Sequence, residues 1–307
     1  MADTPAHGLL TNKVGLVFGA LDENSIAWHI AEAIHREGGR FVLSNAPVTK
    51  RFGSLEGLAE KTGSPIVYAD ATSMDDITAV YAKAQEDFGQ PCDFVVHSIG
   101  MGLNVRKNRA YTDLHYDWYH KTLDISAMSL HRIIKAGIDA EAIANGASIL
   151  SLSYIAAQRV FSKYSEMADA KALLESITRN FGYWLGERRV RINTVSQSPT
   201  RTTAGQGIKG FDAMYEFADR IAPLGNADAA SCADYCVTLL SDLTRMVTMQ
   251  TLYHDGGFSS MGISDAFVEV FAQALDGESL DSESLDSESL DSESLDSESL
   301  DSESLDS

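Results

Sequence analysis

Two tyrosines and a lysine near the middle of the chain have the types and spacing that could stabilise negative charge on a ligand. Tyr164 lies seven residues before Lys171. A helix advances about 100° per residue, so positions seven apart lie within roughly 20° of each other and two turns apart. The nearby ammonium would favour the ionised form of a phenol, whose unperturbed pKa is about 10. The pair is therefore predicted to act together on charge that develops during a reaction.

Tyr154 is predicted to face the same ligand from a different element. It comes just after an apolar run, Ala147 to Leu152, that is typical of a strand. Ligands of open parallel sheets bind at the carboxyl ends of the strands, which is where Tyr154 would stand. A single tyrosine beside a helix would be interpreted as packing, but two tyrosines together with Lys171 favour a site.

The residues after the first predicted strand could bind a phosphate group. The chain there reads Gly19-Ala-Leu-Asp-Glu-Asn-Ser25-Ile26, a loop that opens a helix. Backbone N–H groups and the helix dipole would face the anion, Gly19 would allow close approach, and Ser25 could cap the helix. Only Gly19 remains of the glycine-rich dinucleotide pattern, so an ordinary strand-to-helix turn is an equally good interpretation.

The ends of the second and third predicted strands carry residues that could select an adenosine. NAD-specific folds often place an acid near the ribose, and NADP-specific folds an arginine. Here Ala46 stands at this point with Lys50 and Arg51 shortly after it, so neither rule is met. Asp70, followed by Ala71, could accept a hydrogen bond from the adenine amino group. A turn-forming Asp70 is an alternative of nearly equal weight.

Two further loops follow predicted strands and could contact a flat ligand. One is His97-Ser-Ile99-Gly-Met-Gly102, whose glycines would let the backbone pass close to a ligand. His97 itself is interpreted as a structural histidine. The other is the hydroxyl-rich loop from Ser196 to Gly205, which suits a carboxamide and phosphates. Loops of this composition usually bind nothing, but the place after a strand favours a ligand.

Short β-branched, apolar runs alternate along the chain with longer amphipathic segments, which is the pattern of βαβ units. The predicted strands are Val14 to Phe18, Arg40 to Ser44, Pro65 to Tyr68, Phe94 to His97, Ala147 to Leu152, Arg191 to Val195 and Thr251 to His254. The clearest crossover helices are Ser25 to Glu37, Met74 to Phe88 and Tyr164 to Leu185. We therefore expect an α/β, Rossmann-type doubly wound fold with a seven-stranded parallel sheet, in a single domain over residues 10–275 after an N-terminal extension, 1–9.

The formal net charge of −20 arises largely from the end of the chain. Residues 276–307 repeat Ser-Glu-Ser-Leu-Asp and hold 13 acidic side chains with no Lys or Arg, so the rest of the chain carries −7. A period of five matches neither a helix nor a strand, and one Leu per repeat cannot offset the entropy of ordering. This low-complexity acidic repeat is predicted to be disordered. A functional tail that tethers a basic partner is the less favoured alternative.

The remaining composition excludes several classes of protein. A mildly acidic surface argues against nucleic acid as a partner. The chain has no stretch of about 18 apolar residues and no leader segment, so neither a membrane nor export is expected. Cys92, Cys232 and Cys236 are typical of reduced thiols in the cytoplasm. No His cluster accompanies Cys232 and Cys236, so they are interpreted as buried small side chains, and no metal is expected.

With these motifs in place, residues from about Leu10 to Ala274 resemble the enoyl-acyl-carrier-protein reductases, the branch of the short-chain dehydrogenase/reductase family in bacterial type II fatty-acid synthesis. The shared motifs are Ser-Ile-Ala-Trp at the first helix, His-Ser-Ile-Gly, the paired tyrosines with Lys171, Pro-Thr-Arg-Thr, and Asp255-Gly-Gly-Phe-Ser. The most specific is the spacing Tyr-x6-Lys, because most short-chain dehydrogenases have Tyr-x-x-x-Lys.

The resemblance implies an activity and a set of site residues. A nicotinamide would deliver hydride to the β-carbon of a trans-2-enoyl thioester, and the α-carbon would then be protonated. Tyr164 would hold the enolate oxygen, Lys171 would bind the nicotinamide ribose, and Tyr154 would line the substrate pocket. Gly102 would lie near the acyl chain. The implied cofactor contacts are Gly19, Ser25, Ile26, Ala46, Asp70, Ala71, Ile99, Lys171, Thr200, Arg201, Thr202, Thr203 and Ala204.

The resemblance also implies partners. NADH is the implied cofactor, and NADPH is left open because Ala46 stands where relatives often have a polar side chain at the ribose. The implied substrate is an enoyl thioester of acyl carrier protein, and the implied assembly is a homotetramer. Relatives meet the carrier with a basic cluster after the Thr-rich loop, where this chain has only Lys209 with Asp212 close by. Arg106, Lys107 and Arg109 are the alternative docking residues.

Two other functions remain open at this point. Another short-chain dehydrogenase activity, such as reduction of a 3-oxoacyl thioester or of a sugar ketone, is disfavoured by the wide Tyr–Lys spacing. A cofactor-binding regulator could keep the fold and lose turnover, because a fold does not fix a function. Such a regulator would have no need to keep both Tyr164 and Lys171.

Overall fold

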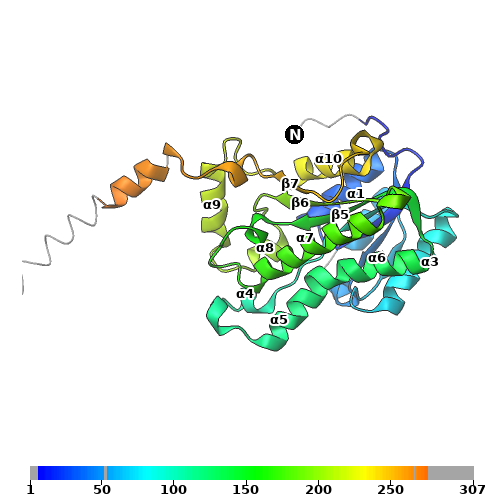
Figure 1. Ribbon diagram of the computed structural model, residues 1–307, viewed down its shortest axis with the longest axis horizontal. Coiled ribbons are helices and arrows are strands. Elements are labelled where there is room, and N and C mark those ends of the chain that lie inside the picture. The colour runs from blue at the N-terminus through cyan, green and yellow to red at the C-terminus, as the bar shows by residue number, and fades with distance from the viewer. Residues whose placement is uncertain (1–5, 52–53, 266, 276–307) are drawn as a thin grey trace, which may run out of the picture. The chain divides into compact units, whose positions relative to one another are not determined.

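The computed structural model describes residues 6–51, 54–265 and 267–275 (Figure 1). The chain divides into two compact units, of which the first ends at Gly262 and the second begins at Ile263. The predicted acidic repeat, 276–307, lies outside the described residues, as do positions 1–5 of the predicted N-terminal extension.

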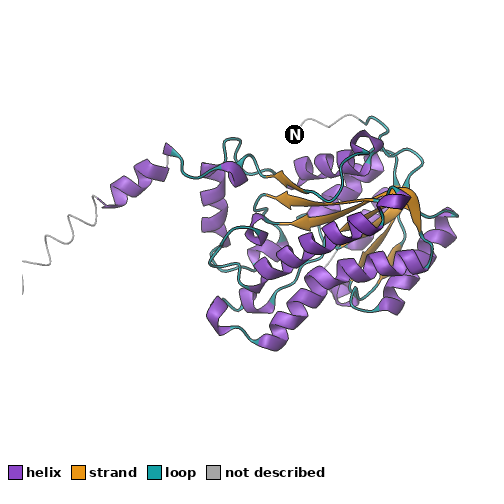
Figure 2. Cartoon of the chain, in the orientation of Figure 1, coloured by secondary structure: helices purple, strands orange, loops and turns teal. Residues whose placement is uncertain are grey.

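The first unit is built around seven parallel strands in the order β3-β2-β1-β4-β5-β6-β7 (Figure 2). They are β1 (Val14–Phe18), β2 (Arg40–Asn45), β3 (Ile66–Tyr68), β4 (Cys92–His97), β5 (Ile143–Ser153), β6 (Arg191–Gln197) and β7 (Thr251–His254). Because β1 lies between β2 and β4, the strand order reverses there, and ligands of such sheets bind in the crevice at the carboxyl ends. The predicted doubly wound, Rossmann-type α/β fold and its seven strands are confirmed.

Helices cover both faces of the sheet. One face carries α1 (Ile26–Arg36), α2 (Leu55–Thr62) and α10 (Ala229–Leu240), and the other carries α3 (Met74–Phe88), α6 (Ser129–Asp139) and α7 (Glu166–Trp184). Four shorter or outlying helices follow the ends of β4 and β6: α4 (Leu103–Arg106), α5 (Tyr116–Leu123), α8 (Thr203–Gln206) and α9 (Phe211–Ile221). A π-helical turn, Asp124–Met128, joins α5 to α6. These last segments stand where a ligand of the sheet would bind.

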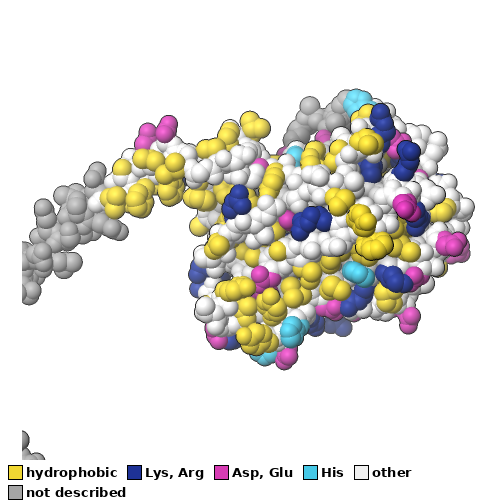
Figure 3. All heavy atoms as spheres, in the orientation of Figure 1, with side chains coloured by type: hydrophobic (Ala, Val, Ile, Leu, Met, Phe, Trp, Pro, Cys, Tyr) yellow, Lys and Arg dark blue, Asp and Glu magenta, His cyan; other side chains and the backbone are white. Residues whose placement is uncertain are grey.

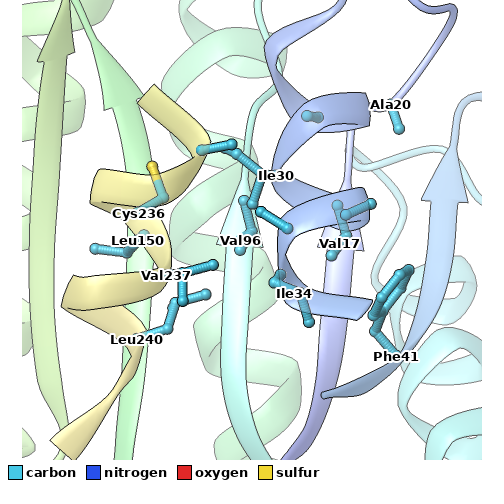
Figure 4. Packing of buried hydrophobic residues seen from close by; sticks show 14 of the residues in the cluster. Val17, Ala20, Ile30, Ile34, Phe41, Val96, Leu150, Cys236, Val237 and Leu240 are labelled. Atoms are coloured by element: carbon cyan, nitrogen blue, oxygen red, sulfur yellow. The ribbon is translucent and has the colours of Figure 1, made fainter. Parts of the chain in front are cut away.

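The first hydrophobic core lies between the sheet and the pair α1 and α10 (Figure 4). Helix α1 buries Ile30 and Ile34, four residues apart and therefore on one face of the helix. Val237 and Leu240 of α10 are buried against the same strands. Cys232 and Cys236 are buried in this cluster too, as predicted, and no group of His, Cys, Asp or Glu in the described part of the chain could hold a metal ion.

The predicted strand boundaries are correct to within a few residues, and the largest error has a visible cause. The prediction began the fourth and fifth strands at Phe94 and Ala147, whereas β4 begins at Cys92 and β5 at Ile143. Cys92 pairs with Ile143, and the register then shifts before Phe94. Asn145 and Gly146 are residue types typical of a turn, and Gly146 has a φ of 81°. The sequence therefore indicated a turn where the structure has an irregular part of β5.

The predicted start of the long helix at Tyr164 is wrong, because α7 begins at Glu166. Ser165 separates them with φ 49° and ψ −139°, a conformation that no helical residue adopts. The argument that Tyr164 and Lys171 share a helix face therefore fails. The long Tyr-x6-Lys spacing reflects a tyrosine that stands before the helix rather than on it.

The described part of the second unit is a helical segment, 265–275, in which position 266 is not described. It exposes apolar side chains, which are visible as yellow spheres (Figure 3). Phe267 and Phe271 stack with their ring centroids 6.2 Å apart. Among the described helices of the whole chain, none is both long enough and apolar enough to span a lipid bilayer.

Candidate active site

Gly19 brings the loop after β1 against the loop after β4. Its φ is +97°, and a Cβ at this position would lie 2.1 Å from the carbonyl oxygen of Ser98. No residue other than glycine fits both conditions. Glycine is thus required here by the contact with Ser98, which is followed by Ile99. The close approach of a ligand to Gly19 remains a prediction.

Ser25 stands at the N-cap of α1, as predicted, but its hydroxyl does not cap the helix. The Oγ atom donates to the carbonyl oxygen of Asp22 and accepts from the N–H of Leu21, at 2.7 and 3.2 Å. The predicted capping role is therefore wrong. The N–H of Trp28 donates to the backbone carbonyl oxygen of Ser25 at 3.1 Å, but the Ser25 hydroxyl bonds no N–H group at the start of α1, which begins with Ile26. The N–H groups of that first turn can therefore meet an anion.

Ala46, Asp70 and Ala71 lie at the ends of β2 and β3, where an adenosine is expected. The Oδ1 atom of Asp70 accepts from the N–H and the hydroxyl of Thr72, at 2.9 and 2.8 Å. Asp70 thus forms the turn that the sequence offered as an alternative. Contact of Asp70 with adenine remains a prediction.

Lys171 is buried between the ends of β4 and β5. Its Nζ atom donates to the carbonyl oxygen of Leu152 at 2.7 Å, and a Cβ at Gly100 would lie 3.9 Å from that nitrogen. Burial lowers the pKa of Lys171 to about 8, and the nearby Glu175 carboxylate opposes the shift. The ammonium thus lies beside the loop that carries Ile99 and Gly102.

Tyr154 and Tyr164 lie side by side, with their ring centroids 5.0 Å apart. Burial raises the pKa of Tyr164, and burial followed by the neighbouring Tyr164 raises that of Tyr154. The predicted lowering of the Tyr164 pKa by Lys171 is therefore wrong. Both phenols keep their protons near neutral pH and are hydrogen-bond donors rather than phenolates.

His97 is buried at the end of β4, close enough to Lys171 for the ammonium to disfavour a proton on the imidazole. Its Nε2 atom is 2.8 Å from the Ser129 hydroxyl, which itself donates to the carbonyl oxygen of Ile125 at 2.6 Å, so the histidine is the donor. Burial, reinforced by Lys171, lowers the pKa of His97 to about 3. A neutral imidazole in this place agrees with the structural role that was predicted.

The Thr-rich loop after β6 is held mainly by contacts at the protein surface. Thr202 caps α8 by accepting from the N–H of Gly205 at 2.9 Å, and Thr203 donates at 2.6 Å to Asp22 in the loop that follows β1. Thr200 donates to the carbonyl oxygen of Ser198 at 3.0 Å. Ala204 lies within α8. The loop therefore closes against the residues that follow β1, as a shared ligand would require.

Arg201 is paired with acidic side chains of α9. Its guanidinium is paired with Asp212 at 2.7 Å and Glu216 at 3.4 Å, and it lies over the ring of Tyr215 at 4.2 Å from the centroid. Thr200 and Arg201 line a cavity of about 200 Å³ whose other walls include Glu23 and Asn24, from the loop after β1, and the start of α10. Cofactor contact by Arg201 remains a prediction.

Gly102 stands directly before α4 and packs against α7. A Cβ there would lie 2.8 Å from Cγ of Met167 and 2.8 Å from a methyl group of Val105, so the position leaves no room for a side chain. The proposed docking residues lie just beyond it: Arg106 and Lys107 are exposed, and Arg109 forms an ion pair with Asp113 at 2.9 Å.

The sequence reasoning missed two buried side chains that hold this loop. Ser126, in the π-helical turn, accepts from the N–H of Met101 at 2.9 Å and lies 3.0 Å from its carbonyl oxygen. Glu166 accepts from the N–H groups of Asn104 and Val105. An acid two residues after Tyr164 is a signal in the sequence, but its partners 62 and 61 positions away are not readable from it.

A doubly wound parallel sheet with a glycine-dependent contact between the loops after β1 and β4, two protonated tyrosines and a buried lysine at its carboxyl edge defines the class of Rossmann-type oxidoreductases. The family described as enoyl-(acyl carrier protein) reductase matches residues 19–259. The chain therefore belongs to the enoyl-(acyl carrier protein) reductase family.

Individual relatives agree with this assignment. The chain is 34% identical over 259 residues to enoyl-[acyl-carrier-protein] reductase [NADH] 2 of Rhizobium meliloti, covering 82% of this chain and 94% of the relative. It is 57% identical to FabI in the FabI–NADH complex from Alistipes finegoldii, with a TM-score of 0.83 over 84% of this chain and 92% of the other. A second FabI structure from that organism is 52% identical, with a TM-score of 0.84 over 89% and 100%.

Proposed function

We propose that this protein reduces the trans-2 double bond of enoyl thioesters carried by acyl carrier protein, with NADH as the reductant, in fatty-acid elongation. The observation that carries the proposal is the pair of protonated phenols of Tyr154 and Tyr164, with ring centroids 5.0 Å apart, just after β5, the strand whose Leu152 carbonyl oxygen accepts from the Lys171 ammonium. Relatives with this activity in their names, and a similar FabI in complex with NADH, support it.

Three features of the chain fit a bound dinucleotide. Gly19 lets the loop after β1 pack directly against the loop after β4, the start of α1 is free of a side-chain cap from Ser25, and Lys171 presents an ammonium beside Gly100. When bound, NADH would supply the hydride that adds to the β-carbon of the substrate. Lys171 would bind the nicotinamide ribose, and the remaining contacts would come from Ile26, Ala46, Asp70, Ala71, Ile99, Thr200, Arg201, Thr202, Thr203 and Ala204.

Tyr164 would act on the oxygen of the substrate. Because burial raises its pKa, the phenol stays protonated and can donate to the thioester oxygen as negative charge develops there. The low local dielectric strengthens that bond. Tyr154, in contact with Tyr164, would line the acyl pocket together with Gly102.

The docking surface for acyl carrier protein is proposed to include Arg106 and Lys107. Both are exposed at the end of α4, a few residues after Gly102, whereas Lys209 stands in a stretch that also carries Asp212. We expect the double change Arg106→Ala with Lys107→Ala to raise KM for the carrier-bound substrate about fivefold, more at low salt, because charge pairs chiefly assist encounter. KM for a coenzyme A thioester should not change; equal changes for both substrates would argue against docking.

The wider setting is proposed on the same grounds. The catalytic domain would span residues 10–275, the acidic repeat would be dispensable for turnover, and the protein would work as a homotetramer in the cytoplasm. Size-exclusion chromatography with light scattering on the intact chain and on a chain ending at Asp276 tests the assembly and the repeat together. Loss of turnover or of the oligomer in the shorter chain would contradict this proposal.

The deciding experiment compares the intact protein with Tyr164→Phe in the oxidation of NADH and, separately, of NADPH. With crotonyl thioester we expect turnover by the intact protein and a fall in kcat of roughly a hundredfold or more in the variant, because one donor to the developing charge is lost. Cofactor binding should be retained. Activity only on acetoacetyl thioester would indicate a carbonyl reductase, and activity on neither a regulator.

A further inference from the structure

Glu166 is a buried carboxylate at the first position of α7, two residues after Tyr164. Its Oε1 atom accepts from the N–H of Asn104 at 2.9 Å, and its Oε2 atom accepts from the N–H of Val105 at 3.1 Å. The Thr122 hydroxyl lies 3.1 Å from Oε1. A buried carboxylate is costly unless several donors meet it, so this arrangement fixes the position of each group.

Hydrogen bonds rather than a cation balance the charge of Glu166. Within the described residues, Glu166 forms no ion pair with Lys, Arg or His, and its donors come from α4 and α5. The two N–H groups belong to the first turn of α4, which begins just after Gly102. The carboxylate therefore joins the start of α7 to the wall that carries Gly102.

The backbone between Tyr164 and Glu166 is held in an unfavourable conformation. Ser165 has φ 49° and ψ −139°, which residues with a side chain rarely adopt, and its buried Oγ has no hydrogen-bond partner within the described part of the chain. Such a conformation persists only where the surroundings over-determine it. Glu166, anchored on its far side by α4 and α5, is the neighbouring residue that can do so.

The loop before α4, which carries Gly102, is fixed at its other end as well. Ser126 bonds both the N–H and the carbonyl oxygen of Met101, while Glu166 bonds Asn104 and Val105. Gly102 lies between these two anchors, and a Cβ on it would lie 3.1 Å from Oε1 of Glu166. The first turn of α4 is thus tied to the start of α7, next to Tyr164 in the chain, through the Glu166 side chain.

We propose that Glu166 is a positioning residue that sets the place of the Tyr164 phenol relative to the acyl-binding loop at Gly102. The inference rests on the proposed role of Tyr164 in holding the substrate oxygen. Glu166 does not touch substrate or cofactor; it acts through the Ser165 backbone and the first turn of α4. A substitution at Glu166 therefore changes the rate of the chemical step and leaves cofactor binding as it was.

The first test is Glu166→Gln, which keeps the shape of the side chain but replaces one carboxylate oxygen with an amide NH2 group. The N–H of either Asn104 or Val105 then loses its acceptor. We expect kcat with crotonyl thioester to fall roughly tenfold, the effect of a displacement in a well-oriented site. The dissociation constant for NADH, measured by cofactor fluorescence, should stay within about twofold. Glu187→Gln, an exposed charge-matched control just after α7, should keep the parental kcat. A kcat for Glu166→Gln equal to that of the control would overturn the proposal.

A second pair of variants applies whether or not Glu166→Gln folds. Thr122→Val keeps the volume and removes the hydroxyl, whose single proton is shared between Glu166 Oε1 at 3.1 Å and the Trp118 carbonyl oxygen at 2.9 Å. Thr122→Ser keeps the hydroxyl. We expect a roughly threefold lower kcat in the first and the parental kcat in the second, since a single hydrogen bond is at stake. An equal kcat in both Thr122 variants would contradict the inference.

The failure of this inference can be told from the failure of the proposed site. If Tyr164→Phe keeps the parental kcat, the role proposed for Tyr164 is wrong whatever Glu166 does. If Tyr164→Phe is impaired but Glu166→Gln is not, only the inference about Glu166 falls. When both hold, Glu166→Gln should cause no further loss in a Tyr164→Phe background, because the two residues act on one contact.

Discussion

The two sides of the candidate site are held by different kinds of contacts. On the α7 side the contacts are buried: Lys171 bonds the carbonyl oxygen of Leu152, and Glu166 bonds the first turn of α4. On the α8 side they lie at the surface, where Thr203 bonds Asp22 and Arg201 pairs with acids of α9. Buried bonds to charged groups are costly to break, whereas exposed pairs contribute little.

The difference indicates a division of labour between the two sides. The α7 side carries Tyr154, Tyr164 and Lys171, the groups whose positions the chemistry depends on, and its hydrogen bonds fix them before a ligand arrives. The α8 side carries Thr203, whose exposed bond to Asp22 can be exchanged for a bond to a ligand at small cost. Variants on the α7 side should therefore change rates strongly, and variants on the α8 side should change them weakly.

The largest expected effect is the pH dependence of Lys171. Burial lowers its pKa to about 8, so in the free enzyme the ammonium is present below that pH and is lost as the pH rises through it. Since the ammonium is the form that would bind the ribose, kcat/KM for NADH should be level below pH 8 and fall about tenfold per pH unit well above it.

Lys171→Arg sharpens this prediction, because a guanidinium keeps its charge throughout the range. The variant should have a lower kcat/KM, because the planar guanidinium does not fit a place shaped for a compact ammonium. Its pH profile of kcat/KM should lack the fall above pH 8. A parental kcat/KM profile that stays level up to about pH 10 would mean that the buried ammonium has no part in binding.

Gly102→Ala should have the next largest effect. Its Cβ would meet Met167 and Val105 at 2.8 Å, so the loop or α7 must shift, at a cost to stability of about 1–3 kcal/mol. KM for the enoyl thioester should rise several-fold. Gly57→Ala in α2 is the matched control, because nothing lies within 4 Å of its Cβ and alanine favours a helix. Equal thermal midpoints for the two variants would show that the packing at Gly102 is not tight.

The sequence predicted what depends on local periodicity, and it failed where a contact or a backbone conformation is non-local. Seven apolar runs identified seven strands, and Met74 to Phe88 is correct to the residue because Ser73 caps the helix and Gly89 ends it with φ 67°. The sequence wrongly predicted that Tyr164 lies on α7, because no residue type near Ser165 indicates its backbone conformation. The bonds of Glu166 were missed for the same reason, since chain folding alone brings Asn104 to it.

The smallest expected effect is that of Arg201→Ala, and it bears directly on the comparison of the two sides. The Arg201 side chain is 46% exposed, and its partners Asp212 and Glu216 are more exposed still, so the free energy of unfolding should change by less than about 1 kcal/mol. If Arg201 keeps these partners when cofactor binds, KM for NADH should rise by no more than about twofold, within the range of a weak surface contact.

A rise of tenfold or more that grows at low salt would show instead that Arg201 leaves α9 for the diphosphate, because a charge contact with the cofactor is screened by ions. The α8 side would then be a part of the site that is assembled by the ligand, while the α7 side is formed in advance.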